Sequence, residues 1–452
     1  MMANSRAMTF PFLKSAYPWL MVCCGMLFYC FNYFLRVSPS VMQGNLTQSF
    51  HITATQFGTL AGLYYLAYTP MQVPAGMIYD KFGARFVLCA ACLIAVVGLS
   101  IFISADSYTM AGVGRFFIGL GCAFAYIGTL KLASIWLPPN RFGTVAGLST
   151  AIGMVSGALS QKYLTQVIEV FGYQDALRTA LIAGVVLSAL ILLLVRNKPK
   201  SPHVSVEHPI NLGQLLSALR CVAANRQMWL IGTIGCLLYL PSSVFLDLWG
   251  IPYLKSVYQL SQKEAVDISS YTFYGWIISG PIIGMISDRI KRRVMPLTFT
   301  GFFAAVLLCI VFYIPVNVSW LSTFFFMIGF CCGAHPLCFA LGKENNPIQI
   351  SGTSVAVTNM LIMIGGAIFQ PVVGKLLDFH TVNSIGLDGL PVYSPSDYTF
   401  ALSVVPIGVA VGIFLSLFVK ETYCESQAKA KDEAIFRPIT NKTLCPKTET
   451  VN

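Results

Sequence analysis

Twelve apolar runs, each long enough to cross a lipid bilayer, dominate this chain of 452 residues. A transmembrane helix needs about 20 consecutive apolar residues. Only 10% of the residues are Asp, Glu, Lys or Arg, whereas a soluble domain carries about 25%. The first six runs are Tyr17–Val41, Phe57–Tyr79, Val87–Ile103, Met110–Leu137, Gly143–Val167 and Ala176–Val195, and the second six are Met228–Leu248, Val266–Ser287, Met295–Ile314, Trp320–Gly342, Gly352–Val373 and Phe400–Val419. The sequence therefore predicts an all-α integral membrane protein with twelve transmembrane helices, and it excludes a soluble enzyme, a coiled coil and a secreted disulfide scaffold.

The Lys and Arg residues are distributed unevenly over the predicted loops. With both termini placed in the cytoplasm, 21 of the 29 lie on the cytoplasmic face, five lie on the opposite face and three lie within spans. Cytoplasmic loops of membrane proteins carry such an excess of positive charge. The net charge of +11 therefore reflects topology, and nucleic-acid binding is disfavoured. Since the N-terminus has no signature of a cleavable signal peptide, we expect a multi-pass protein of the bacterial inner membrane with both termini in the cytoplasm.

The longest internal polar stretch separates the two sets of six runs. It extends roughly from Arg196 to Arg226 and contains several basic residues and prolines. We expect a cytoplasmic N-terminus (1–16), an N-terminal six-helix bundle (17–195), a cytoplasmic linker (196–227), a C-terminal six-helix bundle (228–419) and a cytoplasmic tail (420–452).

One short motif occurs in both halves at the same register. Its residues are Gly76, Asp80, Gly83 and Arg85 after the second run, and Gly284, Asp288 and Arg292 after the eighth. The two leading glycines are 208 residues apart, and so are the two aspartates. This repeat indicates two pseudo-symmetric bundles. Glycine permits close approach of helices, and an aspartate at a helix end can pair with a basic residue across the loop or cap the next helix. We interpret the motif as a cytoplasmic gate clasp of Asp80, Arg85 and Asp288, with ordinary helix capping as the alternative.

The motif resembles the signature loop of the major facilitator superfamily, with its weaker echo in the second half. Arg115-x-x-x-Gly119-x-Gly121 in the fourth run is similar to another motif of that family. The resemblance covers about residues 17–419 and implies two six-helix bundles around a central cavity that opens to either side in turn. It also implies a transporter that needs no ATP.

A narrower resemblance points to the anion:cation symporter branch, which carries organic anions. It rests on Asn32-Tyr33-x-x-Arg36 in the first run, on Arg115, and on the Trp136–Arg141 segment. Leu35 stands where that branch often has Asp, and Cys122 stands where it often has the Glu implicated in proton coupling. The helix-5 signature of drug–proton antiporters is not matched. On overall impression, bacterial relatives of lysosomal dipeptide carriers are a further branch that the chain resembles.

Ionisable groups inside spans are costly and tend to face a cavity or one another. Arg36 lies late in the first run, and Asp247 lies one helical turn beyond its repeat-equivalent position in the seventh. We predict that Arg36 binds a substrate carboxylate, while Asp247 meets a substrate amine, takes part in proton coupling, or pairs with Arg36 in the empty site. The alternative for Asp247 is a position at the wet end of its span. Arg115 is a candidate cavity residue or an interhelical hydrogen-bond donor, and Lys131 either faces the cavity or extends to the cytoplasmic surface.

His335 lies in the middle of the tenth run, before Pro336. Because histidine titrates near neutral pH, it is a candidate proton-coupling group; the alternative is a neutral ring bonded to a carbonyl that Pro336 leaves free. Candidate hydrogen-bonding residues of the cavity are Tyr33, Tyr64, Tyr68, Asn359 and Gln370.

The sequence thus predicts a secondary transporter that moves a small carboxylate-bearing solute, such as an organic anion, amino acid or peptide, by alternating access and with possible proton coupling. A solute sensor with a transporter fold and a carrier of neutral or cationic solutes remain open, and a channel is disfavoured by the duplicated motif. No Walker-type loop, metal cluster or nucleophile arrangement is recognisable, so we expect no enzyme, no cofactor and no metal. We expect a monomer whose partners are the small-molecule substrate and the lipid bilayer, with protons as a further partner if transport is proton-coupled.

Overall fold

The computed structural model describes residues 11–138, 141–197, 212–381, 386 and 389–427. In the first half the six spans are α1 (Pro11–Val41), α3 (Ala54–Phe82), α4 (Ala84–Ile103), α5 with α6 (Tyr108–Cys122 and Ala125–Trp136), α7 (Phe142–Phe171) and α8 (Tyr173–Leu194). In the second half, the first span is formed by three consecutive helical segments, α10 (Arg226–Leu238), η2 (Pro241–Trp249) and α11 (Gly250–Val257). The remaining five are α12 (Gln262–Ile290), α13 (Val294–Tyr313), α14 with α15 (Val318–Cys332 and Leu337–Glu344), α16 (Ser351–His380), and α17 with α18 (Pro395–Leu402 and Val404–Ser416). The predicted all-α fold with two sets of six spans is confirmed.

Two short helices were not expected from the sequence. Helix α2 (Gln43–Phe50) follows the first span, and α9 (Leu212–Ala224) lies within the stretch that we predicted as a linker. Ala218 and Val222 of α9 are buried and form a small apolar cluster with Met228, Ile350 and Val357. Because only one stripe of α9 is apolar, hydropathy alone does not distinguish it from a polar loop.

Ten of the spans are long and apolar enough to be recognised by length and composition alone, within the described residues. The other two are α3 and α12, each of 29 residues. A helix of that length measures about 44 Å and exceeds the thickness of a bilayer core. Both are more polar than the others because they pack against the opposite bundle, α3 on α16 and α12 on α7.

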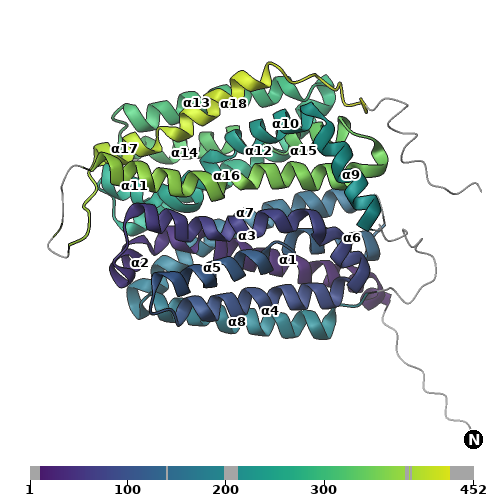
Figure 1. The fold of residues 1–452 in the computed structure, drawn as a ribbon, viewed down its shortest axis with the longest axis horizontal. Coiled ribbons are helices and arrows are strands. Elements are labelled where there is room, and N and C mark those ends of the chain that lie inside the picture. Colours follow the sequence, from purple (N-terminus) through teal and green to yellow (C-terminus); the bar gives the residue numbers. More distant parts are fainter. Residues whose placement is uncertain (1–10, 139–140, 198–211, 382–385, 387–388, 428–452) are drawn as a thin grey trace, which may run out of the picture.

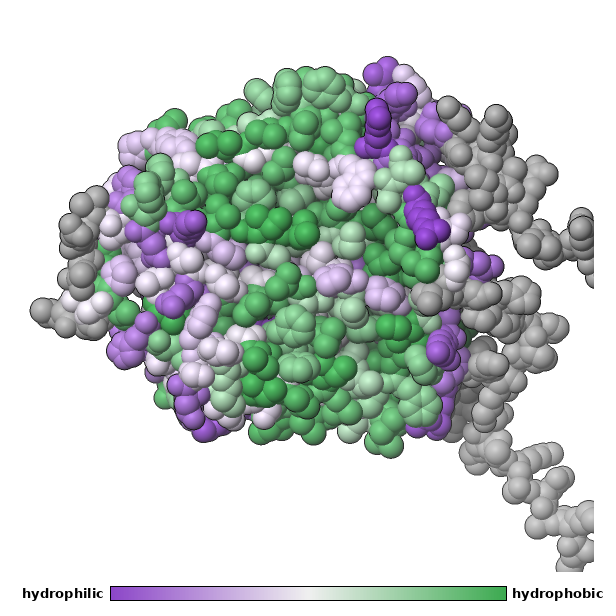
Figure 2. All heavy atoms as spheres, viewed as in Figure 1, coloured by the Kyte–Doolittle hydropathy of each residue, from purple (hydrophilic) through white to green (hydrophobic). Residues whose placement is uncertain are grey.

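The two bundles lie side by side, the N-terminal half in purple to blue and the C-terminal half in teal, green and yellow (Figure 1). A broad apolar band covers the visible face, and hydrophilic residues gather at its two ends (Figure 2). Following the positive-inside prediction, we call the end with α9 the cytoplasmic end and the end with α2 and α17 the external end.

At the external end the two bundles are bonded together. The Asp378 carboxylate of α16 accepts hydrogen bonds from the backbone N–H groups of Ala54 and Thr55 at the start of α3, at 3.2 and 2.9 Å. A Cβ atom at Gly58 would lie only 2.4 Å from the carbonyl oxygen of Gln370, so glycine is required for the approach of α3 to α16. Between α7 and α12, Lys162 pairs with Asp267 at 2.9 Å.

Towards the cytoplasm the bundles separate. The last interbundle hydrogen bond that we identify in this direction runs from Asn359 to Gln72, at 2.8 Å. Beyond it, no atom of another described segment lies within 4 Å of the place where a Cβ atom would stand at Gly76 or Gly284. The expected close helix approach at these two glycines is therefore not present in this conformation, which is closed at the external end.

Gly58→Leu is expected to destabilise this conformation, because the new side chain would collide with the α16 backbone. Overpacking of this kind costs about 1–3 kcal/mol. The measurement is the thermal unfolding midpoint of the purified protein in detergent. Gly76→Leu on the same helix is the control, since it points into open space. Equal midpoints for the two variants would contradict the tight α3–α16 packing.

Candidate functional site

The seventh span changes its helical geometry where it carries its acidic residue. Between Pro241 and Trp249 the chain forms a π-helix, η2, and the N–H of Gly250 bonds to the carbonyl of Phe245, five residues earlier. All nine side chains of η2 are buried, including that of Asp247. π-Helical segments are rare in proteins, and those that occur often lie at functional sites. Here the wider turn sets the direction in which the Asp247 carboxylate points.

Arg36 of α1 and Asp247 of η2 form a buried ion pair that joins the two bundles. The guanidinium Nε and Nη2 atoms both donate to Asp247 Oδ2, at 2.8 and 2.6 Å. The side chains are only 5% and 1% exposed. Breaking a pair buried this deeply leaves an uncompensated charge. Of the positions expected for Asp247, the structure thus shows the pairing with Arg36 and not the wet end of a span.

Two tyrosines complete the coordination of this pair. Tyr239 accepts a hydrogen bond from Arg36 Nη2 at 2.7 Å, and Tyr65 donates to Asp247 Oδ2 at 2.5 Å. The Cζ atom of Arg36 lies 5.2, 5.2 and 5.7 Å from the ring centres of Tyr33, Tyr65 and Tyr239. Aromatic faces at these distances attract a cation. The guanidinium therefore sits in a collar of three rings, two from the N-terminal bundle and one from the C-terminal bundle.

Several hydrogen-bonding positions of the pair are still open. Asp247 Oδ1 is buried with no hydrogen-bond partner among the described residues. For Arg36 Nη1, we identify no hydrogen bond to any described residue. The pair can thus accept one further donor at the carboxylate and one further acceptor at the guanidinium.

His335 lies next to this collar, in the break between α14 and α15. Its ring stacks on Tyr239 at 4.6 Å and lies 5.8 Å from Trp276. Its Nε2 atom is buried without a hydrogen-bond partner among the described residues. The hydrogen bond to a backbone carbonyl that we considered for a neutral His335 ring is therefore not present at Nε2. Tyr239 contacts both His335 and Arg36 and so lies between them.

Arg115 is buried within the N-terminal bundle and does not meet Arg36. Its Nη1 donates to the carbonyl of Leu35 at 2.8 Å, and its Cζ lies 5.3 Å from the Tyr64 ring centre. Its Nε has no partner among the described groups. Arg115 is therefore an interhelical hydrogen-bond donor, and it has no acidic partner in the described part of the chain. Cys122, which stands where the symporter branch often has Glu, does not supply a carboxylate.

The other predicted cavity residues lie around the pair without touching it. Tyr64 donates to Asn32, and Tyr68 stacks on Tyr64 with ring centres 5.6 Å apart. Gln370 donates to the carbonyl of Ser243 at 2.7 Å, which fixes η2 against α16. Asn359 bonds to Gln72 of the opposite bundle, nearer the cytoplasm.

Sequence reasoning missed Tyr65, Tyr239 and Trp276. Tyr65 lies between the predicted Tyr64 and the predicted Tyr68 on one helix, and only the position of Asp247 in space distinguishes it from them. Tyr239 lies before η2 and Asp247 lies within it. Because the π-helix changes the number of residues per turn, regular α-helical spacing does not predict that the two side chains share a face. With 20 Tyr in the chain, residue type alone gives no signal.

The N-terminal copy of the cytoplasmic motif differs from its predicted pairing. Asp80 pairs with Lys131 of α6 at 2.7 Å, not with Arg85. The Arg85 side chain instead donates through Nε to the carbonyl of Leu192, at 2.8 Å. Asn197, just beyond α8, accepts from the Arg85 N–H at 2.8 Å and so caps α4. Gly83 has a φ of +80°, which favours glycine at this turn.

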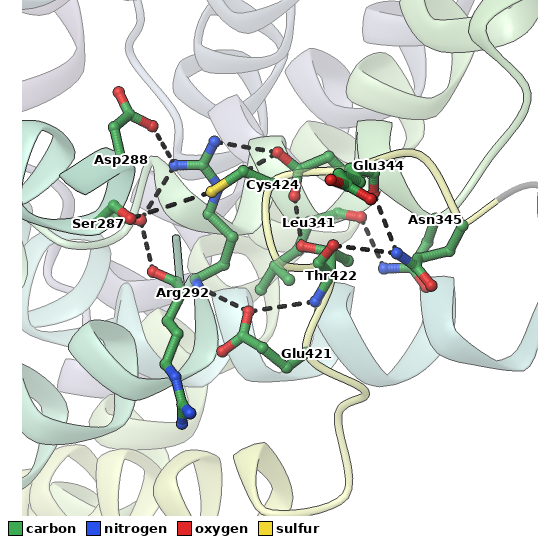
Figure 3. A network of polar contacts seen from close by, with 12 residues as sticks. Ser287, Asp288, Arg292, Leu341, Glu344, Asn345, Glu421, Thr422 and Cys424 are labelled. Carbon is green, nitrogen blue, oxygen red and sulfur yellow. Dashed lines mark hydrogen bonds and ion pairs between the residues drawn. The ribbon is translucent and has the colours of Figure 1, made fainter. Parts of the chain in front are cut away.

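The C-terminal copy forms a related network (Figure 3). Asp288 pairs with Arg293 at 2.6 Å and not with Arg292, whose carbonyl instead accepts from Ser287 at 2.7 Å. Arg293 also reaches Glu344 of α15 at 3.0 Å. Burial acts to lower the pKa of Arg293, but the hydrogen bonds to Glu344 and Asp288 outweigh it and raise this pKa. Glu421, beyond α18, accepts from the backbone N–H of Arg293 at 2.7 Å.

Both copies share one arrangement, in which a residue in the segment that follows the sixth span of a bundle caps the third span of that bundle. Every partner described in these two networks belongs to the same bundle. The expected gate clasp is therefore a brace within each bundle in this conformation, and it does not join one bundle to the other.

Two six-helix bundles with a polar site between them define a transport protein of the membrane. A family model, Major Facilitator Superfamily, matches residues 22–370. The chain belongs to that superfamily: it is a multi-pass membrane protein and a secondary transporter, not an enzyme.

Relatives in bacteria and solved structures agree with this assignment. The chain is 24% identical to the uncharacterized transporter YybO of Bacillus subtilis over 77% of this chain and 84% of that one. It is 22% identical to the probable galactarate/D-glucarate transporter GudP of Escherichia coli over the same shares. A bacterial homologue of the lysosomal transporter Spinster, inward-facing and unoccupied, matches with a TM-score of 0.68 and 14% identity over 90% of this chain and 96% of that one. The inward-open xylose transporter XylE of E. coli matches with a TM-score of 0.66 and 13% identity over 93% and 99%.

Asp247→Ala is expected to destabilise the protein by about 3–5 kcal/mol, because it leaves the Arg36 cation buried and unpaired. Replacing both Arg36 and Asp247 by Ala should lower the free energy of unfolding by less than the sum of the two single replacements. The measurement is a double-mutant cycle of unfolding free energies. The more exposed Lys162–Asp267 pair is the control, with an expected coupling below about 1 kcal/mol. Additive effects at Arg36 and Asp247 would show that the two do not interact.

Proposed function

We propose that this transporter carries a small organic solute bearing a carboxylate, and that Arg36 binds that carboxylate. One observation carries the proposal: a buried cation lies between the two bundles, with donors that no described residue uses. An alternating-access carrier binds its solute between the bundles, where rocking exposes the site to either side in turn. Among the described residues, Arg36 is the buried cation that pairs across the two bundles.

The chemistry of the pair suits reversible capture of an anion. Asp247 occupies the Nε edge of the guanidinium, and Nη1 remains for an incoming carboxylate. Charge-assisted bonds from arginine to a carboxylate are short and directional. A second carboxylate on the same guanidinium weakens the hold of Asp247, so that solute binding favours separation of the bundles at the external end.

The names of the relatives support an anionic cargo. GudP is described as a probable carrier of galactarate and D-glucarate, and the Cupriavidus necator relative SauU, 23% identical over 62% of this chain and 67% of that one, as a probable sulfoacetate transporter. Because these relatives are bacterial, we place the chain in the bacterial inner membrane. The excess of basic residues in the loops of one face supports a topology with both termini in the cytoplasm.

A solute that also carries an ammonium group is the second candidate. Asp247 Oδ1 has no donor among the described residues, and an ammonium is the group that would satisfy it. Amino acids and peptides carry both charges, and such a solute would meet Arg36 and Asp247 at once.

Arg36→Ala is expected to reduce uptake to the background of empty vesicles, because the carboxylate loses its cation. The measurement is uptake of radiolabelled organic acids, amino acids and dipeptides into proteoliposomes. Arg178→Ala is the control, since that arginine is exposed and pairs with Asp175 within one helix. Unchanged uptake in Arg36→Ala would refute the proposal, and binding without any flux would favour a sensor.

His335→Gln is expected to flatten the pH dependence of uptake if His335 accepts the coupled proton. Its unpartnered Nε2 is the atom at which that proton would bind. The measurement is initial uptake rate across a series of external pH values. His380→Gln is the matched control, because His380 pairs with Asp397 at the external end. A pH dependence identical to that of the unaltered protein would exclude His335.

A further inference from the structure

The buried charges around the site do not cancel. In the described part of the chain, the buried charged side chains are Arg36, Arg115, Asp247 and Asp397. Asp397 lies at the external end and is bonded to His380 at 2.6 Å. The remaining three lie at the site or next to it, since Arg115 bonds to the carbonyl of Leu35, the residue before Arg36. With a neutral His335, two cations and one anion leave a single positive charge.

Lys131 and Asp80 do not alter this sum. They pair with each other at 2.7 Å near the cytoplasmic end and cancel. A charge inside the membrane interior is strongly unfavourable unless it is compensated. A solute with one negative charge would therefore neutralise the site, whereas a dianion would reverse its sign.

Aromatic rings surround the place where the body of the solute would lie. A carboxylate bound at Arg36 Nη1 brings the atoms attached to it into the range of the three collar rings, whose centres lie 5.2 to 5.7 Å from Cζ. The rings of Trp276 and His335 pack against Tyr239, with their ring centres 5.7 and 4.6 Å from the Tyr239 ring centre. Tyr29 packs edge-on against Tyr33 at 5.2 Å.

Several of the hydroxyl groups nearby are already engaged. Tyr65 donates to Asp247, Tyr64 donates to Asn32, and Tyr239 accepts from Arg36. A solute with many hydroxyls needs a partner for each one when it is buried. A flat ring needs none and gains stacking contacts instead.

From this charge and these rings, we propose that the solute is a monocarboxylate with an aromatic body. This inference rests on the proposed function, because it assumes that the carboxylate binds at Arg36. It differs from the cargo named for GudP, galactarate or D-glucarate, both of which are hydroxylated dicarboxylates.

The test is a two-by-two panel of probes, measured by calorimetric binding to the full-length protein in detergent. Phenylacetate and phenylmalonate carry a ring with one and two carboxylates, and D-galactonate and galactarate are the hydroxylated counterparts. We expect phenylacetate to bind at least tenfold more tightly than each of the other three, and Arg36→Ala to abolish its binding.

A charge change at the site provides the second arm. Asp247→Asn adds one positive charge, and it should improve binding of phenylmalonate relative to phenylacetate at least tenfold. Asp175→Asn makes the same chemical change at an exposed residue of α8 and should leave that ratio unaltered. A ratio that does not change in Asp247→Asn overturns the charge argument.

The outcomes separate this inference from the proposed function. Tightest binding of D-galactonate, lost in Arg36→Ala, overturns the aromatic part and leaves the carboxylate site standing. Tightest binding of either dicarboxylate, lost in the same variant, overturns the single-charge part. Binding of none of the four probes overturns the inference alone, because the proposed function is tested by uptake of the wider panel of solutes. Binding that Arg36→Ala does not affect overturns the inference and the proposed function together.

Discussion

The buried Arg36–Asp247 ion pair is the contact on which the arrangement of the two bundles depends. A charge pair that is almost fully buried tolerates only the arrangement in which its bonds are made, because a misplaced partner leaves a charge unpaired in the membrane. The α3–α16 contact, the capping by Asp378 and the position of η2 are all compatible with this one arrangement. The same pair is also the group most sensitive to an incoming anion.

The fold was predictable because hydropathy in a membrane protein reports directly on spans. Backbone groups must be satisfied within each helix, so a run of about 20 apolar residues has essentially one outcome. The 208-residue register then aligned the two halves and brought Arg36 and Asp247 to similar depth. The spans α3 and α12 contain more polar residues than the others, so composition alone does not identify them as transmembrane helices. These two fall outside the ten spans recognised by length and apolarity.

The detail of the site was not predictable in the same way. Which side chains meet Arg36 depends on contacts between helices far apart in the sequence, and on a π-helix that changes the face on which Asp247 and Tyr239 lie. The partner of Asp80 shows the same limit. Local spacing favoured Arg85, five residues away, yet the carboxylate bonds to Lys131 on another helix. Local patterns indicate that a group will be paired, and tertiary packing decides with what.

The cytoplasmic braces have a thermodynamic consequence. A contact shifts the equilibrium between two conformations only by the difference of its free energy in the two. Because the bonds of Asn197 and Glu421 each remain within one bundle, rigid-body rocking leaves them intact, and their contribution cancels from that equilibrium. They make each bundle stiff without favouring either direction of opening. The balance between the two ends is then set by the contacts that cross from bundle to bundle, such as the packing of α3 on α16 and the Arg36–Asp247 pair.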